Sequence, residues 1–244
     1  MIEVKKLTKF YDDTLAVDDL SFEVEPGTIL GMVGQNGAGK TTTLRTIAGI
    51  LPPSNGQVLV AGHDVVTDSI SAKKALAYIP DEPRLFDALT VWEHLRFYAS
   101  AYQVDPWEDT ANNLLEQFEL IGKKDSTAGE LSRGMRQKVA ICCGFLFDPR
   151  AILFDEPHTG LDPQGIRNMK DSIVERANQG AAVIVSSHLL SLIEGVCTHL
   201  IILNKGQSQF CGSIEQLREK HPGLGDDHSL EEVFFRETSD STLE

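Results

Sequence analysis

The chain has 244 residues, enough for one large domain or for a domain with a subdomain, and its 41% hydrophobic and 24% charged residues are typical of a soluble globular protein. Its net charge of −14 and pI of about 4.9 argue against general DNA or RNA binding, because such a surface repels nucleic-acid phosphates. No signal-peptide pattern follows Met1, and the longest apolar runs, such as residues 140–147, fall short of the ~20 residues that span a bilayer. Any role at a membrane is therefore expected at its surface, through a partner.

The cysteines point to a reducing compartment. They contain no C-x-x-C pair, and two of them are adjacent within an apolar run. This pattern favours reduced, mostly buried thiols in a cytosolic protein over a metal site. The cysteines are Cys142, Cys143, Cys197 and Cys211.

The first part of the chain predicts a pair of strands followed by a strand–loop–helix unit. Residues 2–25 alternate apolar and polar positions as two strands around a polar turn that holds Tyr11. A short buried strand is expected over residues 28–33 and a helix over 43–51. Pro52-Pro53 is expected to end that helix, because proline cannot continue it.

The loop between this strand and this helix fits G-x-x-x-x-G-K-[ST], the phosphate-binding P-loop. Its glycines let the backbone wrap closely, so that peptide N–H groups and a helix N-terminus point at one anion. Lys40 supplies a positive charge for the β and γ phosphates, and the Thr41 hydroxyl is a predicted Mg²⁺ ligand. The expected nucleotide-binding residues here are Gly34, Gln35, Asn36, Gly37, Ala38, Gly39, Lys40, Thr41 and Thr42.

The middle of the chain predicts a helical insertion. A strand at 57–60, a short helix at 69–75 and a strand at 76–79 continue the alternation of the first part. From Pro80 onward the pattern becomes helical, with helices expected over 90–101, 107–121 and from the 131–138 segment to residue 147. Thr90 and Glu93 form a capping-box pattern at the first of them. Residues 85–147 are therefore read as an insertion that interrupts the strand–helix alternation.

The alternation then resumes to residue 220. Strands are expected over 151–154, 182–186, 200–203 and, as an edge, 209–211; helices are expected over 164–178, 189–197, 214–220 and 230–236, with a loop at 221–228 and a frayed acidic tail. Because the inner strands read as continuous apolar runs, the sheet is expected to be largely parallel and buried on both faces.

Two carboxylates end the strand at 151–154. Asp155 is a predicted Mg²⁺ ligand, and Glu156 is the predicted general base that orients and polarises the attacking water. Two exposed acids capping a strand are the ordinary alternative, but a P-loop upstream favours the catalytic interpretation. His188 follows the next strand, and either a γ-phosphate contact or a purely structural role fits it.

Two further residues carry open interpretations. Tyr11 is either a platform on which the adenine base stacks or a packing residue in a turn. Ser132, with Gly134 after it, is a good helix N-cap, and the same helix N-terminus is also a candidate phosphate site. The spacing alone does not say whose phosphate would bind there.

Taken together, these motifs resemble the ATP-binding cassette (ABC) transporter ATPase family over nearly the whole chain. The P-loop, Leu131-Ser132-x-Gly134-x-x-Gln137, Asp155-Glu156, Gly160-Leu161-Asp162 and His188 occur in the family's order. The resemblance implies an α/β fold with a P-loop NTPase (RecA-like) core, a mostly parallel sheet, an N-terminal antiparallel β-subdomain and an α-helical subdomain insertion. The implied division is 1–84 with 148–210 as the catalytic core, 85–147 as the helical subdomain and 211–244 as a C-terminal extension.

The resemblance also implies a mechanism. Two cassettes pack head to tail, with two ATP molecules at the interface, and Ser132 and Gly134 face the ATP held by the partner's P-loop. Asp162 lies in the loop that crosses the interface, Tyr11 stacks on adenine and His188 contacts the γ-phosphate. A transmembrane permease subunit converts the cycle of dimer closure and ATP hydrolysis into transport, touching the helical insertion. The implied location is the cytoplasmic face of the membrane, and the implied cofactors are ATP and Mg²⁺.

Two positions depart from the family's commonest pattern. Asp81 stands where a Mg²⁺-ligating glutamine is usual, and aspartate can also ligate Mg²⁺; Arg133 stands where a glycine is usual, and could pair with phosphates or with the partner chain. Both features, and the tail at residues 229–234, are similar to the export-type branch, and residues 78–83 together with 131–138 resemble bacterial cassettes of the Ecs type. All catalytic residues are present, which suits a homodimer. A non-transport ABC ATPase acting on ribosomes or DNA, and a P-loop kinase or GTPase, are the alternatives.

Overall fold

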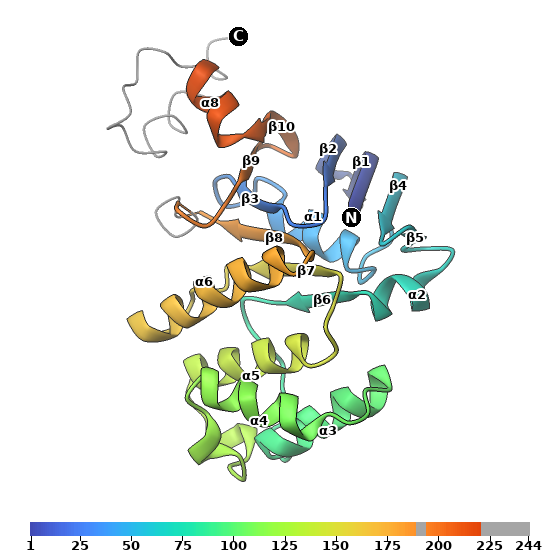
Figure 1. Cartoon of the computed structure of the whole chain (residues 1–244). Coiled ribbons are helices and arrows are strands. Elements are labelled where there is room, and N and C mark those ends of the chain that lie inside the picture. The colour runs from blue at the N-terminus through green and yellow to red at the C-terminus, as the bar shows by residue number, and fades with distance from the viewer. Residues whose placement is uncertain (189–193, 221–244) are drawn as a thin grey trace.

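A computed structural model describes residues 1–188 and 194–220 (Figure 1). Its strands form two sheets, one of four strands in the order β2-β1-β4-β5 and one of six in the order β10-β9-β3-β8-β7-β6. The strands of the first sheet are β1 (Ile2–Tyr11), β2 (Thr14–Val24), β4 (Asn55–Val60) and β5 (His63–Asp64). Those of the second are β3 (Ile29–Val33), β6 (Leu76–Ile79), β7 (Ala151–Asp155), β8 (Ala182–Ser187), β9 (His199–Asn204) and β10 (Gln207–Ser213).

The helices fall between these strands and after them. They are α1 (Lys40–Ile47), α2 (Ser69–Lys74), α3 (Val91–Tyr102), α4 (Glu108–Gln117), α5 (Arg133–Phe145), α6 (Pro163–Asn178) and α8 (Ile214–Lys220), with short 3₁₀ turns η1 (Ile121–Lys123) and η2 (Ala128–Glu130).

The six-stranded sheet is parallel except for its last strand. The pairs of β9 with β3, β3 with β8, β8 with β7 and β7 with β6 are parallel, and only the pair of β10 with β9 in this sheet is antiparallel. All five residues of β3 and of β7 are buried, as the continuous apolar runs predict. The predicted α/β fold with a mostly parallel sheet and an antiparallel sheet at the N-terminus is therefore confirmed.

Alternate residues of the inner strands feed two separate hydrophobic cores. In β7, Ile152 and Phe154 pack with α3, α4, α5 and α6, whereas Ala151 and Leu153 pack with α1 and the antiparallel sheet. The period-2 alternation of a strand explains why one strand serves both cores. Each large side chain buried in this way contributes about 1.5–3 kcal/mol to stability.

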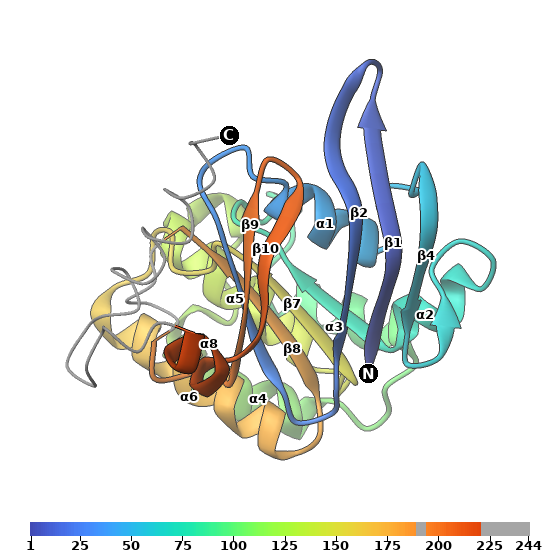
Figure 2. The same cartoon turned by 90° about the horizontal axis from the view of Figure 1, so that it is seen from above.

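The helical layer α3–α5 lies against β6 and β7 at one side of the molecule (Figure 1). Its attachment includes Gly144 of α5, where an added Cβ would stand 3.3 Å from Ile79 Cδ1 of β6. In the view from above, α1 lies between the antiparallel sheet and the six-stranded sheet (Figure 2). The bounds 85–147 for a helical subdomain remain a prediction.

Several element ends differ from the sequence expectation. The first helix begins at Lys40 instead of residue 43, because the left-handed Gly39 (φ 102°) acts as its N-cap, and it ends at Ile47 well before Pro52-Pro53, because Gly49 (φ 63°) is also left-handed. The helix expected over 107–121 ends at Gln117, since Glu119 has φ 58°.

The segment after β8 was expected to be helical over 189–197. Residues 189–193 lie outside the described residues, and residues 194–196 form a turn in which Gly195 has φ 79°. The helix predicted at 230–236, the loop at 221–228 and the acidic tail also lie outside the described residues. The capping box at Thr90 and Glu93 is confirmed, with each residue's side chain accepting from the other's backbone N–H.

Candidate nucleotide-binding and hydrolysis site

The P-loop joins the end of β3 to the start of α1, with Gln35, Asn36 and Gly37 exposed and Ala38 buried beneath them. Its last glycine explains the tight path of the backbone. Gly39 has φ 102°, and a Cβ there would stand 2.7 Å from the Ala16 carbonyl oxygen. Because α1 starts directly after Gly39, its free N–H groups open onto the loop.

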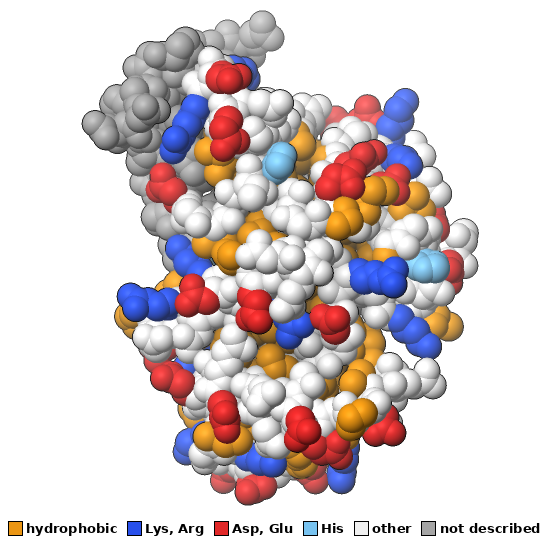
Figure 3. All heavy atoms as spheres, in the orientation of Figure 1, with side chains coloured by type: hydrophobic (Ala, Val, Ile, Leu, Met, Phe, Trp, Pro, Cys, Tyr) orange, Lys and Arg blue, Asp and Glu red, His pale blue; other side chains and the backbone are white. Residues whose placement is uncertain are grey.

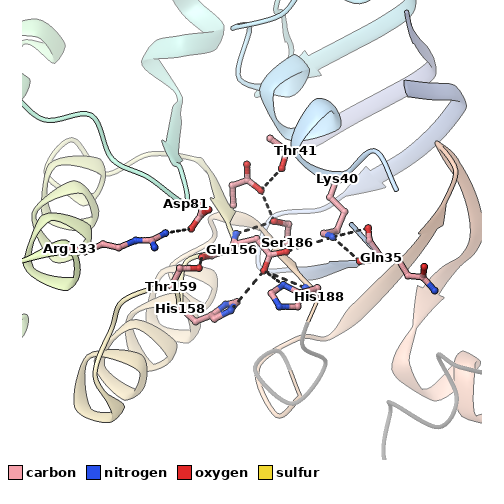
Figure 4. Close-up of polar contacts among 12 residues, drawn as sticks. Gln35, Lys40, Thr41, Asp81, Arg133, Glu156, His158, Thr159, Ser186 and His188 are labelled. Carbon is pink, nitrogen blue, oxygen red and sulfur yellow. Dashed lines mark hydrogen bonds and ion pairs between the residues drawn. The ribbon is translucent and has the colours of Figure 1, made fainter. Parts of the chain in front are cut away.

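Lys40 is buried, with 6% of its side chain exposed, and folds back over its own loop. Its Nζ donates to the Gly34 carbonyl at 2.7 Å and to the Gln35 carbonyl at 3.3 Å, and lies 3.6 Å from Glu156 Oε1 (Figure 4). The amine is thus held inside the loop with a carboxylate as its counter-ion. Thr42 lies in the first turn of α1, where its carbonyl accepts from Thr46 Oγ1.

Asp155 ends β7 and is 2% exposed. Its Oδ1 accepts from Thr41 Oγ1 at 3.1 Å and from Ser186 Oγ at 2.9 Å, and its Oδ2 accepts from the Tyr78 hydroxyl at 3.1 Å. The structure therefore brings two of the three residues predicted as Mg²⁺ ligands, Thr41 and Asp155, within hydrogen-bond distance of each other, whereas the third, Asp81, pairs with Arg133.

Sequence reasoning missed Ser186 and Tyr78. They lie on β8 and β6, the two strands that flank β7. The sequence feature that could have identified them is the position of each residue near the carboxyl end of an apolar run. Burial, and secondarily the charge of Asp155, raises the pKa of Tyr78 to about 12. Tyr78 therefore stays protonated at neutral pH and donates to the carboxylate.

Glu156 follows Asp155 in a left-handed conformation, with φ 48°. Its N–H donates to Ser186 Oγ at 3.1 Å and to the Ser186 carbonyl at 3.3 Å, and its carbonyl accepts from Thr159 Oγ1 at 2.9 Å. Such a conformation is costly for a non-glycine residue and persists where the surroundings hold it. These bonds aim the side chain toward Lys40 and His188.

His188 and Glu156, predicted separately from the sequence, are in direct contact. Glu156 Oε2 lies 2.9 Å from His188 Nδ1 and accepts from the His188 backbone N–H at 3.3 Å. A second imidazole, His158, lies on the other side, with Nε2 4.0 Å from the same oxygen. Burial lowers the pKa of His158, with the charge of Glu156 acting in the opposite sense. Sequence reasoning missed His158, although it stands two residues after Glu156.

The signature segment, residues 131–138, lies apart from the P-loop of its own chain. Ser132 N-caps α5, with its Oγ accepting from the Met135 N–H at 3.3 Å. No hydrogen bond or ion pair found among residues 1–188 and 194–220 links Ser132 or Gly134 to residues 34–42. Within one chain, Ser132 is therefore a helix cap, and a role toward a second chain's ATP stays a prediction.

Gly134 packs tightly against the loop after β7, since a Cβ there would stand 2.2 Å from the Gly160 carbonyl oxygen. We expect Gly134→Ala to destabilise the fold by about 1–3 kcal/mol, because backbone atoms on both sides must move. The midpoint of thermal unfolding should fall by about 2–12 °C. Gly122→Ala is the matched control, since a Cβ at Gly122 meets nothing within 4 Å. Equal unfolding midpoints for the two variants would contradict this packing argument.

Asp162 N-caps α6, with its Oδ1 accepting from the Gly165 N–H at 2.7 Å and lying 3.7 Å from Lys138 Nζ. Its side chain is 60% exposed, so the predicted interface role stays open. Tyr11 is the last residue of β1 and is 43% exposed, with Lys9 Nζ 5.6 Å from its ring centroid. Adenine stacking on Tyr11 remains a prediction.

Asp81 lies beside the predicted Mg²⁺ ligands but turns toward α5. A cavity of about 190 Å³ is lined by Thr41, Asp81 and Asp155 among others. Arg133 Nη2 donates to Asp81 Oδ1 at 3.1 Å and lies 3.9 Å from Glu82 Oε1 (Figure 4). Arg133, expected to pair with phosphates or a partner chain, thus pairs within its own chain here.

A P-loop between a buried parallel strand and a helix, with a carboxylate at the end of β7, a parallel strand separated from β3 by β8 alone, defines a P-loop NTPase. Residues 17–159 match the sequence profile of the family described as "ABC transporter", and the chain belongs to this family. It is an ATP-binding subunit and an ATPase of this family.

Individual relatives agree with this assignment. The chain is 34% identical over 242 residues to the ABC-type transporter ATP-binding protein EcsA of Bacillus subtilis, covering 98% of this chain and 97% of that protein. It is 36% identical over 228 residues to ATP-binding cassette sub-family A member 2 of Rattus norvegicus, of which it spans 9%. A solved structure described as the ATP binding subunit of an ABC transporter superposes with a TM-score of 0.92 at 33% identity, covering 98% of this chain and 99% of that one. None of the described helices is both long enough and apolar enough to cross a bilayer.

Proposed function

We propose that this chain hydrolyses ATP as a Mg²⁺-dependent homodimer on the cytoplasmic face of a membrane, and that it drives export through a separate permease subunit. The observation that carries the hydrolytic part is the convergence of Lys40, Thr41, Asp155, Glu156 and His188. These side chains come from α1, from the end of β7 with the loop after it, and from the residue after β8, and their contacts measure 2.9 to 3.6 Å.

Three of the residues that line the 190 Å³ cavity fit Mg²⁺, while Arg45 and Arg84 also form part of its wall. Thr41, Asp81 and Asp155 offer oxygen atoms alone, the donor type that Mg²⁺ prefers. Thr41 and Asp155 would hold the ion, and Asp81 would join them by leaving Arg133. When bound, the ion neutralises charge on the β and γ phosphates. Lys40 would exchange its contacts with Gly34, Gln35 and Glu156 for the same phosphates.

Glu156 is the proposed general base. Its Oε2 faces His188, and its backbone is fixed by Ser186 and Thr159, so its carboxylate has a defined direction. A carboxylate held in this way can orient a water molecule and accept its proton. His188 would contact the γ-phosphate and hold Glu156 in place. Phosphoryl transfer to water depends mainly on such positioning and on charge neutralisation.

The second active-site half would come from another copy of the chain. Ser132, Gly134 and Asp162 lie at the starts of α5 and α6, and no hydrogen bond or ion pair among the described residues joins them to the P-loop of their own chain. A head-to-tail dimer would bring Ser132 and Gly134 to the ATP held by the partner's Lys40. Because this chain carries the complete residue set, two identical copies suffice for two sites. Dimerisation would depend on ATP, which fills the gap between the copies.

A groove offers a docking place for the permease. A cavity of about 610 Å³ lies between the helical layer and the core, and residues of α3, α5 and β6 line it, including Tyr98, Tyr102 and Phe147. Its walls mix aromatic rings with charged side chains such as Arg45 and Lys73. A short helix of a membrane subunit with apolar residues would fit such walls.

We expect Ile50→Asp to abolish co-purification with the permease while leaving ATP affinity unchanged. Ile50 lines the groove and is 55% exposed, so a carboxylate there puts an unpaired charge in the contact at little cost to folding. Ile70→Asp is the control, because Ile70 is 72% exposed on α2 and does not line the groove. The measurement is the permease recovered per cassette from detergent extracts. Full recovery with Ile50→Asp would rule out this groove as the contact.

Co-purification also tests the proposal against the alternative of a non-transport ATPase acting on ribosomes or DNA. The net charge of −14 disfavours nucleic-acid binding. On the face shown in Figure 3, Lys and Arg side chains lie interspersed with Asp and Glu, so the described residues there form no continuous basic patch. A tagged chain purified from native membranes in mild detergent should bring a multi-helix membrane protein at near-equal amount. Recovery with ribosomal or DNA-repair proteins alone would refute the transport role and leave the ATPase chemistry intact.

A further inference from the structure

Three potential metal ligands meet beside the P-loop. Glu156 and His158 come from the loop after β7, and His188 comes from the end of β8 (Figure 4). One ligand atom from each side chain lies within 4.8 Å of the other two, and the centroids of the two imidazole rings are 5.7 Å apart. Only Glu156 and His188 have a place in the proposed hydrolysis, so His158 is a residue whose presence the ATPase reaction does not explain.

The two oxygens of Glu156 face different partners. Oε1 lies 3.6 Å from Lys40 Nζ, whereas Oε2 lies 2.9 Å from His188 Nδ1 and 4.0 Å from His158 Nε2. Oε2 therefore stands with two imidazole nitrogens on the side away from the lysine. One oxygen and two nitrogens therefore lie within 4.8 Å of one another.

The donor set distinguishes this cluster from the predicted Mg²⁺ site. Two imidazoles and a carboxylate suit Zn²⁺ and related transition metals, whereas Mg²⁺ prefers oxygen ligands in octahedral geometry. Thr41, Asp81 and Asp155 supply oxygen alone. Zn²⁺ and Mg²⁺ would therefore bind to different sets of ligands within one site.

The cluster needs little movement to close on a metal. Zn²⁺ bonds of about 2.0–2.1 Å in tetrahedral geometry place ligand atoms about 3.3 Å from one another. The measured 2.9 and 4.0 Å separations straddle this value. The backbone of Glu156 is held by Ser186 and Thr159, so closing on a metal requires rotation of side chains alone.

The cluster is open on one side. The side chains of Glu156 and His158 are 15% and 14% exposed, and that of His188 is 46% exposed. A metal ion can enter past His188 and keep a water molecule in its fourth position, as three-ligand zinc sites do.

We propose that Glu156, His158 and His188 form a binding site for a divalent transition metal of the zinc class in the nucleotide-free chain, and that occupation of this site blocks ATP hydrolysis. The second part rests on the proposed role of Glu156 as general base. A metal bound to Oε2 withdraws the electron pair that would accept the proton of water, and it also holds His188. The reaction stops although the P-loop residues are untouched.

Calorimetric titration of the nucleotide-free chain with ZnCl₂, in the presence of excess Mg²⁺, tests whether the metal binds. The chain should carry Cys211→Ser, which removes an exposed thiol that also binds zinc. Binding of one Zn²⁺ per chain is expected, and His158→Gln should weaken it by at least about tenfold, the lower end of what a lost partner outside the ligand set costs. His63→Gln is the matched control, because His63 is an exposed histidine that contacts Asp68 on the antiparallel-sheet side of the chain.

ATPase assays over a range of Zn²⁺ concentrations test the inhibition. His158→Gln should keep the basal rate, since Glu156 retains its contact with His188, and should need at least about tenfold more Zn²⁺ for half-inhibition. His63→Gln should behave like the parent. Equal zinc affinity of His158→Gln and the parent in calorimetry would overturn the site, whatever the ATPase rate. If His158→Gln loses zinc binding but zinc does not inhibit the parent, the proposed block of ATP hydrolysis is overturned. That result would also count against Glu156 as the base.

Discussion

Replacing Glu156 with glutamine is expected to lower the rate of ATP hydrolysis by about 10²–10⁴-fold, the contribution typical of a general base, while ATP binding is preserved. Glutamine keeps the size of the side chain and an oxygen that accepts from the His188 N–H, but it cannot take a proton from water. It also removes the negative charge 3.6 Å from Lys40 Nζ, so a carboxylate no longer competes with the phosphates for the lysine.

The measurements are phosphate release under saturating ATP, ATP affinity by calorimetry, and molar mass by light scattering with and without ATP. The variant should accumulate as an ATP-bound dimer, because closure occurs and the reopening step that hydrolysis triggers does not. Glu82→Gln is the matched control, since Glu82 is an acid with a 79% exposed side chain near the same site. Hydrolysis by Glu156→Gln at near the parent rate would refute Glu156 as the base.

The Lys40→Ala variant is expected to bind ATP at least about 30-fold more weakly. Removing one member of a buried, hydrogen-bonded charge pair costs about 2 kcal/mol or more, and each 1.4 kcal/mol is tenfold in affinity. Lys40 is 6% exposed, and its charged amine lies inside the P-loop. The alanine side chain has no group that could replace its contact with the phosphates.

Calorimetric titration with ATP in the presence of Mg²⁺ measures this loss. Lys123→Ala is the control, because Lys123 is an exposed lysine in η1 of the helical layer. Circular dichroism should accompany both variants, since Lys40 also ties the P-loop together through Gly34 and Gln35. ATP affinity equal to that of the parent in a folded Lys40→Ala variant would count against the phosphate-binding role of the loop.

The parts of the site that lie on one strand or one loop were predictable from the sequence. The P-loop residues are contiguous, and Asp155 and Glu156 end an apolar run that can only be a buried strand. The parallel pairing of β3 with β8 and of β8 with β7 places the ends of β7 and β8 on the side of the sheet where the P-loop follows β3.

Contacts between strands were not predictable in the same way. Ser186 and Tyr78 reach Asp155 because β8 and β6 flank β7 in register, and register is a property of the assembled sheet. The same holds for the ion pair of Arg133 with Asp81, which are 52 residues apart in the chain. Helix ends were missed where a non-glycine residue adopts a left-handed conformation, as Glu119 does.

Helix α5 is anchored differently at its two ends. Near its C-terminal end, Gly144 packs on Ala77 and Ile79 of β6, an apolar contact that dissolved ions do not weaken. At its N-terminal end, Arg133 pairs with Asp81, and their side chains are 49% and 45% exposed. Dissolved salt therefore weakens their attraction, with a Debye length of about 8 Å at physiological ionic strength. Helix α5 is therefore held to the core by an apolar contact near one end and in part by an exposed ion pair at the other. Raising the ionic strength should weaken the pairing of Arg133 with Asp81, whereas the apolar contact of Gly144 with β6 and the close packing of Gly134 on Gly160 should be retained.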